Sequence, residues 1–254
     1  MLKNDTKPFS LWDVPLALVL LTRLPLPRLP EAIFTRQARA AWAFPVVGLI
    51  VGGLGCLTGW MAMGASLSPF VAATLLVAVL IITTGAMHED GLADTFDGLW
   101  GGFTRERRLE IMKDSHIGTY GVLGLLISQL LRISAVTAVM ANGAFWAVLA
   151  ACVFSRAVMP ILMVSLPNAR NAGLSHSVGV PNAGSVGVSL GLAVLIVLLL
   201  GGTQTIIPIL CAAIVVGALA IIAKAKIGGQ TGDILGASQQ LAEIAFLLAV
   251  TSQF

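Results

Sequence analysis

Seven apolar stretches of this chain are long enough, or nearly so, to cross a lipid bilayer as helices. They cover residues 40–64, 69–87, 117–141, 144–166, 185–201, 205–223 and 235–250. A helix needs about 17–25 apolar residues to cross the hydrocarbon layer, so the fifth and seventh stretches are the shortest candidates. Charged residues make up only 11% of the 254 residues, whereas a soluble domain averages about 25%. We therefore expect an all-α fold, a polytopic membrane helix bundle of about seven transmembrane helices, and exclude a soluble or a disordered chain.

An eighth apolar segment, residues 14–21, is too short to span the bilayer. We expect it to form a short N-terminal helix that lies at the interface or re-enters the membrane. Residues 1–254 are predicted to form a single integral membrane domain.

Basic residues occur in alternate connections only, which predicts the orientation of the bundle. The connections around Ser66, Asn142 and Thr203 contain no Lys or Arg, so the other side is predicted to be cytoplasmic and the C-terminus to face out. The net charge of +3 is therefore a topology signal and does not indicate nucleic-acid binding. The basic connections carry Arg23, Arg28, Arg36, Arg39, Arg105, Arg107, Arg108, Lys113, Arg170, Lys224 and Lys226.

More than half of the twelve carboxylates lie between residues 89 and 114, at the cytoplasmic end of the second stretch. If that helix continues, Asp90, Asp94 and Asp97 fall at i, i+4 and i+7 on one face. Three like charges on one stripe repel each other, and a divalent cation would compensate them. Oxygen ligands suit Mg²⁺, Mn²⁺ or Ca²⁺ better than zinc. We predict that Asp90, Asp94 and Asp97 bind metal, and that Asp114 completes the cluster from the next helix.

The alternative is a solvated loop whose acids pair with nearby arginines. It suits Glu106 and Glu110, whereas the segment that carries the aspartates is too apolar for a free loop. Lys113 and Arg105, on the same connection, are candidates for substrate binding and otherwise serve as positive-inside anchors. His116 could bind phosphate or cap the following helix.

Three charges lie inside predicted spans: Arg132, Arg156 and Glu243. A charged side chain at the centre of a transmembrane helix costs at least about 2.5–3.5 kcal/mol, so it normally faces a partner or a cavity. The two arginines are candidate partners of Glu243, and either could reach the acidic cluster or an anionic substrate.

A second polar segment, residues 228–233, precedes the last stretch. Its three glycines allow the backbone to approach a ligand closely, and the following helix N-terminus could receive a phosphate. Gln230 and Asp233 are therefore candidate substrate ligands, although Asp233 could equally serve as an N-terminal helix residue.

The runs at 88–98, 111–118 and 228–233, with Thr22-Arg23-Leu24-Pro25 and Phe44-Pro45-Val46-Val47-Gly48, resemble the cobalamin synthase family over nearly the whole chain. That family is adenosylcobinamide-GDP ribazoletransferase. The resemblance implies a bacterial inner-membrane, Mg²⁺-requiring enzyme with its active site on the cytoplasmic side. Such an enzyme transfers adenosylcobinamide phosphate from adenosylcobinamide-GDP to α-ribazole or its 5′-phosphate, and it releases GMP.

A more distant similarity is to the CDP-alcohol phosphotransferases of phospholipid synthesis. Asp94-Thr-Phe-Asp97-Gly98 matches the start of their D-x-x-D-G-x-x-A-R pattern, but Gly101 and Gly102 stand where Ala and Arg would be expected. A phosphotransferase of that kind is one alternative function. A cation- or proton-coupled transporter is another, and it would require acids near the middle of the membrane.

The residues and the resemblance indicate the same chemistry, in which a hydroxyl attacks a phosphorus of a pyrophosphate and displaces a nucleoside monophosphate. Asp97 and His88 are the candidates for the base that deprotonates the hydroxyl. Besides the two substrates and the lipid bilayer, a homo-oligomer is a possible partner arrangement.

Overall fold

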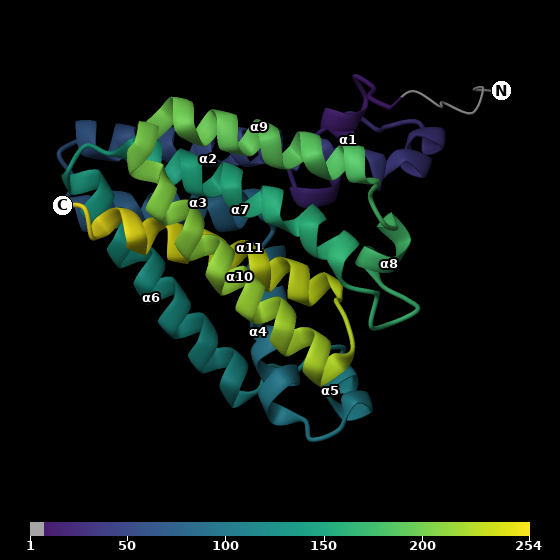
Figure 1. Cartoon of the computed structure of the whole chain (residues 1–254). Coiled ribbons are helices and arrows are strands. Elements are labelled where there is room, and N and C mark those ends of the chain that lie inside the picture. The colour runs from purple at the N-terminus through teal and green to yellow at the C-terminus, as the bar shows by residue number, and fades with distance from the viewer. Residues whose placement is uncertain (1–7) are drawn as a thin grey trace.

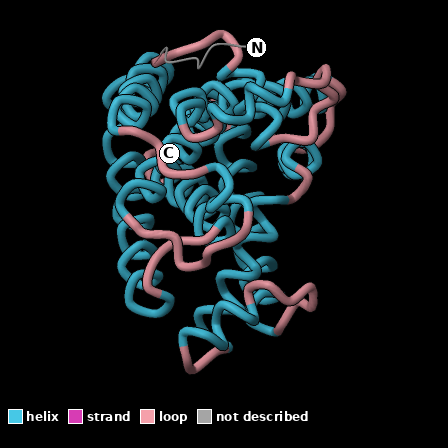
Figure 2. Tube along the Cα trace, turned by 90° about the vertical axis from the view of Figure 1, so that its right-hand side faces the viewer, coloured by secondary structure: helices cyan, strands magenta, loops and turns pink. Residues whose placement is uncertain are grey.

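The computed structural model describes residues 8–254, and within that range the chain is helical with no strand (Figures 1 and 2). The predicted all-α fold is confirmed. The α-helices are α1 Asp13–Leu21, α2 Phe44–Gly64, α3 Pro69–Thr84, α4 Met87–Gly101, α5 Arg105–Ile111, α6 Thr119–Ala141, α7 Phe145–Ser165, α8 Leu174–Val178, α9 Ala183–Gly201, α10 Ile206–Ile227 and α11 Gly232–Thr251. The 3₁₀ helices are η1 Glu31–Arg36, η2 Arg39–Ala43 and η3 Gly202–Thr205.

Five helical runs of the described residues are long and apolar enough to cross a membrane, or six if α3 and α4 count as one bent span. The chain is therefore a multi-pass membrane protein, but the predicted count of seven spans is not confirmed. One reason is that α3 has only 16 residues before the chain bends by 88° into α4. The other is that the fifth and sixth apolar stretches form one helical run, Ala183–Ile227, in which η3 joins α9 to α10.

The bend between α3 and α4 corrects the expectation that the acidic residues continue the second span. Gly85 and Ala86 both adopt left-handed backbone angles, with φ of 65° and 58°. Their amides donate to the carbonyls of Ile82 and Ile81, which closes the C-terminus of α3 as a Schellman motif. A side chain at Gly85 would also overlap the aliphatic part of Arg23, so glycine is required there. The acids thus occupy a separate helix, α4, which leaves the direction of α3.

Helix α7 lies at the centre of the bundle and buries most of its side chains against α2, α9 and α11. Gly48 and Gly52 of α2 let that helix approach closely, because a Cβ at either position would overlap Cys152 of α7. Gly121 and Gly124 of α6 pack in the same way on α4. The small residues singled out in the sequence therefore serve helix packing.

Three of the basic connections meet at one end of the bundle. Arg105 Nε donates to the Ile227 carbonyl at 2.9 Å, and its Nη2 donates to the Ala169 carbonyl at 3.0 Å. In Figure 1, α5 and α8 lie at that end and the C-terminus lies at the other. This arrangement agrees with the predicted sidedness, in which basic connections share one face.

The predicted short N-terminal helix is present as α1, Asp13–Leu21. It is held by a buried ion pair between Asp13 Oδ1 and Arg36 Nε at 2.9 Å, and Trp42 Nε1 donates to the same carboxylate at 2.9 Å. Leu20 and Leu21 of this helix reach the site described next.

Candidate active site

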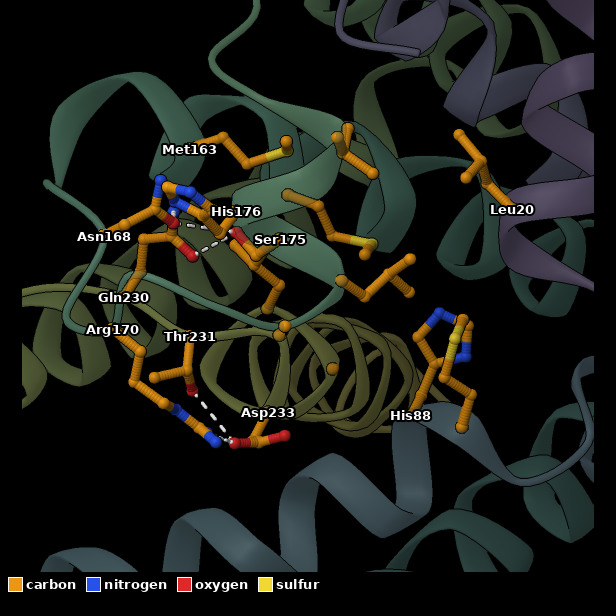
Figure 3. A pocket seen from close by; sticks show the side chains of 18 of the residues that line it. Leu20, His88, Met163, Asn168, Arg170, Ser175, His176, Gln230, Thr231 and Asp233 are labelled. Carbon is orange, nitrogen blue, oxygen red and sulfur yellow. Dashed lines mark hydrogen bonds and ion pairs between the residues drawn. The ribbon is translucent and has the colours of Figure 1, made fainter. Parts of the chain in front are cut away.

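A cavity of about 220 Å³ lies where α4, α7, α8 and α11 meet beside α1 and the start of α2 (Figure 3). Its polar lining comes from three separate parts of the chain: the start of α4, the connection from α7 into α8, and the start of α11. Two of these parts are the motifs singled out in the sequence. The polar lining residues are His88, Asp90, Asn168, Arg170, Ser175, His176, Gln230, Thr231 and Asp233.

Two carboxylates, from α4 and α11, lie at one wall of this cavity, and a third lies beside them. Asp90 and Asp233 line the cavity itself, and Asp94 lies one helical turn further along α4, half-buried. The charges of Asp233, Asp90 and Asp97 all repel that of Asp94, whereas Arg170 attracts it. The aspartates of α4 are therefore joined by Asp233 of α11, which was predicted as a substrate ligand and not as a member of this group.

These carboxylates are suited to a hard divalent cation, although they do not enclose one. No group of three or more Asp, Glu, His or Cys side chains within residues 8–254 is arranged to hold a metal ion alone. Mg²⁺ usually takes only one or two protein carboxylates and completes its octahedron with water and substrate phosphate. Asp90 and Asp233 border the cavity and Asp94 lies beside them, and all three supply oxygen only and repel one another.

Asp97 is oriented away from the cavity and towards α6. Its Oδ2 accepts the Gly118 amide at 2.7 Å, and its Oδ1 accepts the Gly121 amide at 2.9 Å. The carboxylate therefore satisfies two of the free amides at the N-terminus of α6 from a neighbouring helix. A Cβ on Gly118 or Gly121 would overlap Asp97, so these glycines leave room for the contact.

His88 lines the cavity and is 1% exposed. Its Nε2 has no hydrogen-bond partner among the described residues, which is uncommon for a buried polar atom. His88 thus has a ring nitrogen without a partner in the described part of the chain, whereas both oxygens of Asp97 accept hydrogen bonds.

The structure leaves Asp114, His116 and Lys113 on the exposed connection between α5 and α6. Asp114 Oδ1 lies 2.7 Å from Nδ1 of His116, and hydrogen bonds from this side chain and its amide lower the pKa of the Asp114 carboxyl. The charges that act on Asp114 are those of His116 and Arg107, whereas Asp94 is affected by Asp233, Asp90, Asp97 and Arg170. The structure therefore does not bring this predicted ligand to the other three.

Arg105 was predicted to bind substrate, but its guanidinium donates to the Ile227 and Ala169 carbonyls. These carbonyls flank the turn into α11 and the start of the connection after α7. Arg105 thereby ties α5 to the two segments that carry Asp233 and Arg170.

Arg132 and Glu243 form the buried pair that the sequence suggested, with Nη2 and Oε1 2.6 Å apart. Arg132 Nη1 also pairs with Glu89 Oε1 at 2.9 Å. This single guanidinium therefore joins α6 to α4 and to α11. All three side chains are buried, and none of them lines the cavity.

Arg156 completes this buried network from α7. Its Nη1 lies 4.0 Å from Glu243 Oε2 and donates to the Cys152 carbonyl at 3.0 Å. Gln239 Nε2 donates to Glu243 Oε2 at 2.7 Å, and Gln240 Nε2 donates to Glu89 Oε1 at 3.1 Å. Both arginines predicted to bind substrate thus have protein partners in the structure.

The start of α11 is joined to the connection after α7. Gln230 Nε2 donates to Asn168 Oδ1 at 2.6 Å, and Ser175 Oγ donates to Gln230 Oε1 at 2.7 Å. Asp233 forms an ion pair with Arg170, and the Thr231 side chain, not Asp233, caps α11. Asn168, Arg170 and Ser175 are site residues that were not predicted from the sequence. The only signal was a polar segment after the fourth span, with no spacing that links it to residues 228–233.

The family model described as "Cobalamin-5-phosphate synthase" matches residues 13–251 of this chain. A relative from Bradyrhizobium diazoefficiens, named adenosylcobinamide-GDP ribazoletransferase, is 44% identical over 245 residues, or 94% of this chain and 93% of its own. Proteins of the same name from Mesorhizobium japonicum and Brucella ovis are 40% identical over 240 residues and 42% over 243 residues. They cover 94% and 91% of this chain, and 92% of their own lengths in each case. No solved structure matches.

Proposed function

The chain belongs to the cobalamin-5-phosphate synthase family, and we propose that it carries out the adenosylcobinamide-GDP ribazole transfer for which its relatives are named. A ribose hydroxyl of α-ribazole, or of its 5′-phosphate, attacks the cobinamide-bearing phosphorus of the donor. The pyrophosphate bond breaks, GMP leaves, and adenosylcobalamin or its 5′-phosphate is formed. This is the last stage of cobalamin synthesis.

The observation that carries this proposal is the meeting of Asp90 of α4 with Asp233 of α11 at one wall of the cavity, with Asp94 beside them. Transfer of a phosphoryl group depends on positioning and charge neutralisation more than on covalent chemistry by the protein. We infer that Asp90, Asp94 and Asp233 hold Mg²⁺. When bound, the ion would neutralise charge on the pyrophosphate oxygens.

His88 is the better candidate for the proton acceptor. A base must be able to receive a proton from the attacking hydroxyl. His88 lines the cavity, and its buried Nε2 has no hydrogen-bond partner among the described residues. Asp97 instead holds the N-terminus of α6 through both of its oxygens. We infer that Asp97 positions α6 against α4 and that His88 takes the proton.

The cytoplasmic side of a bacterial inner membrane is the location we propose for the site. The support is that Arg105, Arg108 and Lys226, which belong to basic connections, are joined by hydrogen bonds at the end of the bundle next to the cavity.

Release of GMP tests the proposal directly. The full chain, purified in lipid nanodiscs, is expected to release GMP only when adenosylcobinamide-GDP and α-ribazole or its 5′-phosphate are both present. Removal of divalent cations with EDTA should abolish release, and added Mg²⁺ should restore it. Release of CMP from a CDP-activated lipid donor would instead favour the phospholipid-synthesis alternative. Full turnover in EDTA would contradict the metal assignment alone.

Two substitutions separate the roles of His88 and Asp97. His88→Gln should lower kcat about 10²-fold, the lower range for loss of a general base, and leave thermal unfolding nearly unchanged. Asp97→Ala removes the acceptor of two buried amides and should lower the free energy of unfolding by about 1–3 kcal/mol. Turnover and thermal unfolding of both variants, measured in detergent, show which residue acts in catalysis and which one stabilises the fold. Near-normal turnover of His88→Gln would return the base role to Asp97.

A further inference from the structure

The cavity has two ends of different chemistry. Asp233 and Arg170 lie at one end, whereas Met163 and Leu20 lie at the other (Figure 3). Met159 and Leu174 add further apolar lining. A ligand that occupies the whole cavity therefore has one polar end directed to the carboxylates and one apolar end.

On the α8 side, the polar side chains Gln230, Asn168 and Ser175 hydrogen-bond with one another, whereas His176 is exposed at the cavity. Gln230 is 1% exposed, and its amide is used by Asn168 and Ser175. A guanine base, which carries several donors and acceptors, would leave most of them unpaired against methionine and leucine, at a cost for each one. A base with few polar atoms would lose few hydrogen bonds against these apolar side chains.

The cavity is too small for the corrin ring, which is the largest part of the substrates. A cavity of about 220 Å³ can receive a nucleoside, but a corrin ring with its side chains is several times larger. Two nucleosides are therefore candidates to occupy the cavity: the guanosine of the donor and the acceptor α-ribazole. The base of α-ribazole is a benzimidazole with two methyl groups and a single free ring nitrogen.

We propose that this cavity is the acceptor subsite, with the dimethylbenzimidazole against Met163, Leu20 and Met159 and the ribose towards Asp90 and Asp233. The inference rests on the proposed function and adds which substrate occupies the cavity. The donor then approaches the carboxylates from outside the cavity, where the corrin ring has room. The apolar wall also selects among nucleosides, because purine bases would lose hydrogen bonds on entry.

Binding of labelled α-ribazole to the full chain in nanodiscs, without donor, tests the subsite independently of turnover. Met163→Gln keeps the side-chain length and makes the wall polar, and it should weaken α-ribazole binding about tenfold or more. In turnover, the KM for α-ribazole should rise by a similar factor and the KM for adenosylcobinamide-GDP should stay within about twofold. Leu174→Gln, on the half-exposed helix α8, should act in the same direction and guards against misfolding of the first variant.

Met140→Gln is the matched control, because Met140 is equally buried on α6 and lies outside the cavity. It should leave α-ribazole binding unchanged in folded protein. Excess GMP should not displace α-ribazole from the wild-type chain. Displacement by GMP, or a KM increase for the donor alone, would overturn the assignment in favour of guanosine. Unchanged binding in both cavity variants would also overturn it. If α-ribazole binds as expected but no GMP is released, the proposed function fails and the subsite stands.

Discussion

Asp94→Asn is expected to reduce kcat by about 10³-fold while the protein still folds. Asp94 lies among Asp90, Asp97 and Asp233, so it contributes to the negative charge that would attract a divalent cation. Asparagine keeps the shape of the side chain but removes the charge. Loss of a metal ligand forfeits several kcal/mol of charge stabilisation in the transition state, and about 4 kcal/mol corresponds to 10³-fold. Single-turnover GMP release at a series of Mg²⁺ concentrations measures the effect.

The matched control is Glu106→Gln, which removes an acidic charge from the exposed surface of α5. It should change kcat by less than about twofold, since exposed single charges contribute little. A higher Mg²⁺ requirement in Asp94→Asn, absent from Glu106→Gln, would support the metal role. Near-normal turnover of Asp94→Asn at the wild-type Mg²⁺ requirement would refute it.

The sequence allowed prediction of features that depend on local spacing. Asp90, Asp94 and Asp97 share one face because a helix places i, i+4 and i+7 together, whatever the rest of the fold does. The pairing of Glu243 with Arg132 was also predictable, because charges inside apolar spans need partners and few candidates exist.

Features that depend on the approach of distant segments were not predictable from one sequence. The 88° bend at Gly85-Ala86 left the helical pattern of the flanking residues unbroken, because apolar and small residues continue through it. The approach of Asn168 and Arg170 to Gln230 and Asp233 depends on how α7 and α11 pack. The count of seven spans is not confirmed for a related reason, since hydropathy does not report where a helix bends.

Arg132→Met is expected to lower the stability of the protein by about 3–5 kcal/mol, the cost of removing one member of a buried ion pair. Arg132 joins Glu89 of α4 to Glu243 of α11, and both glutamates would remain buried without this partner. Because α4 and α11 carry the site carboxylates, the loss should also disturb the cavity. Thermal unfolding in detergent, followed by tryptophan fluorescence, measures the effect.

A second substitution shows whether charge balance is the cause. When Arg132→Met is combined with Glu243→Met, one positive and one negative buried charge remain, those of Arg156 and Glu89. The buried charges are then balanced again. The double variant should therefore recover at least half of the lost stability, a coupling that two independent packing defects would not produce. Arg107→Met is the control, because Arg107 pairs with Glu110 on the exposed surface of α5 and should cost less than about 1 kcal/mol. If Arg132→Met unfolds at the same temperature as Arg107→Met, the buried network does not hold the helices that carry the site.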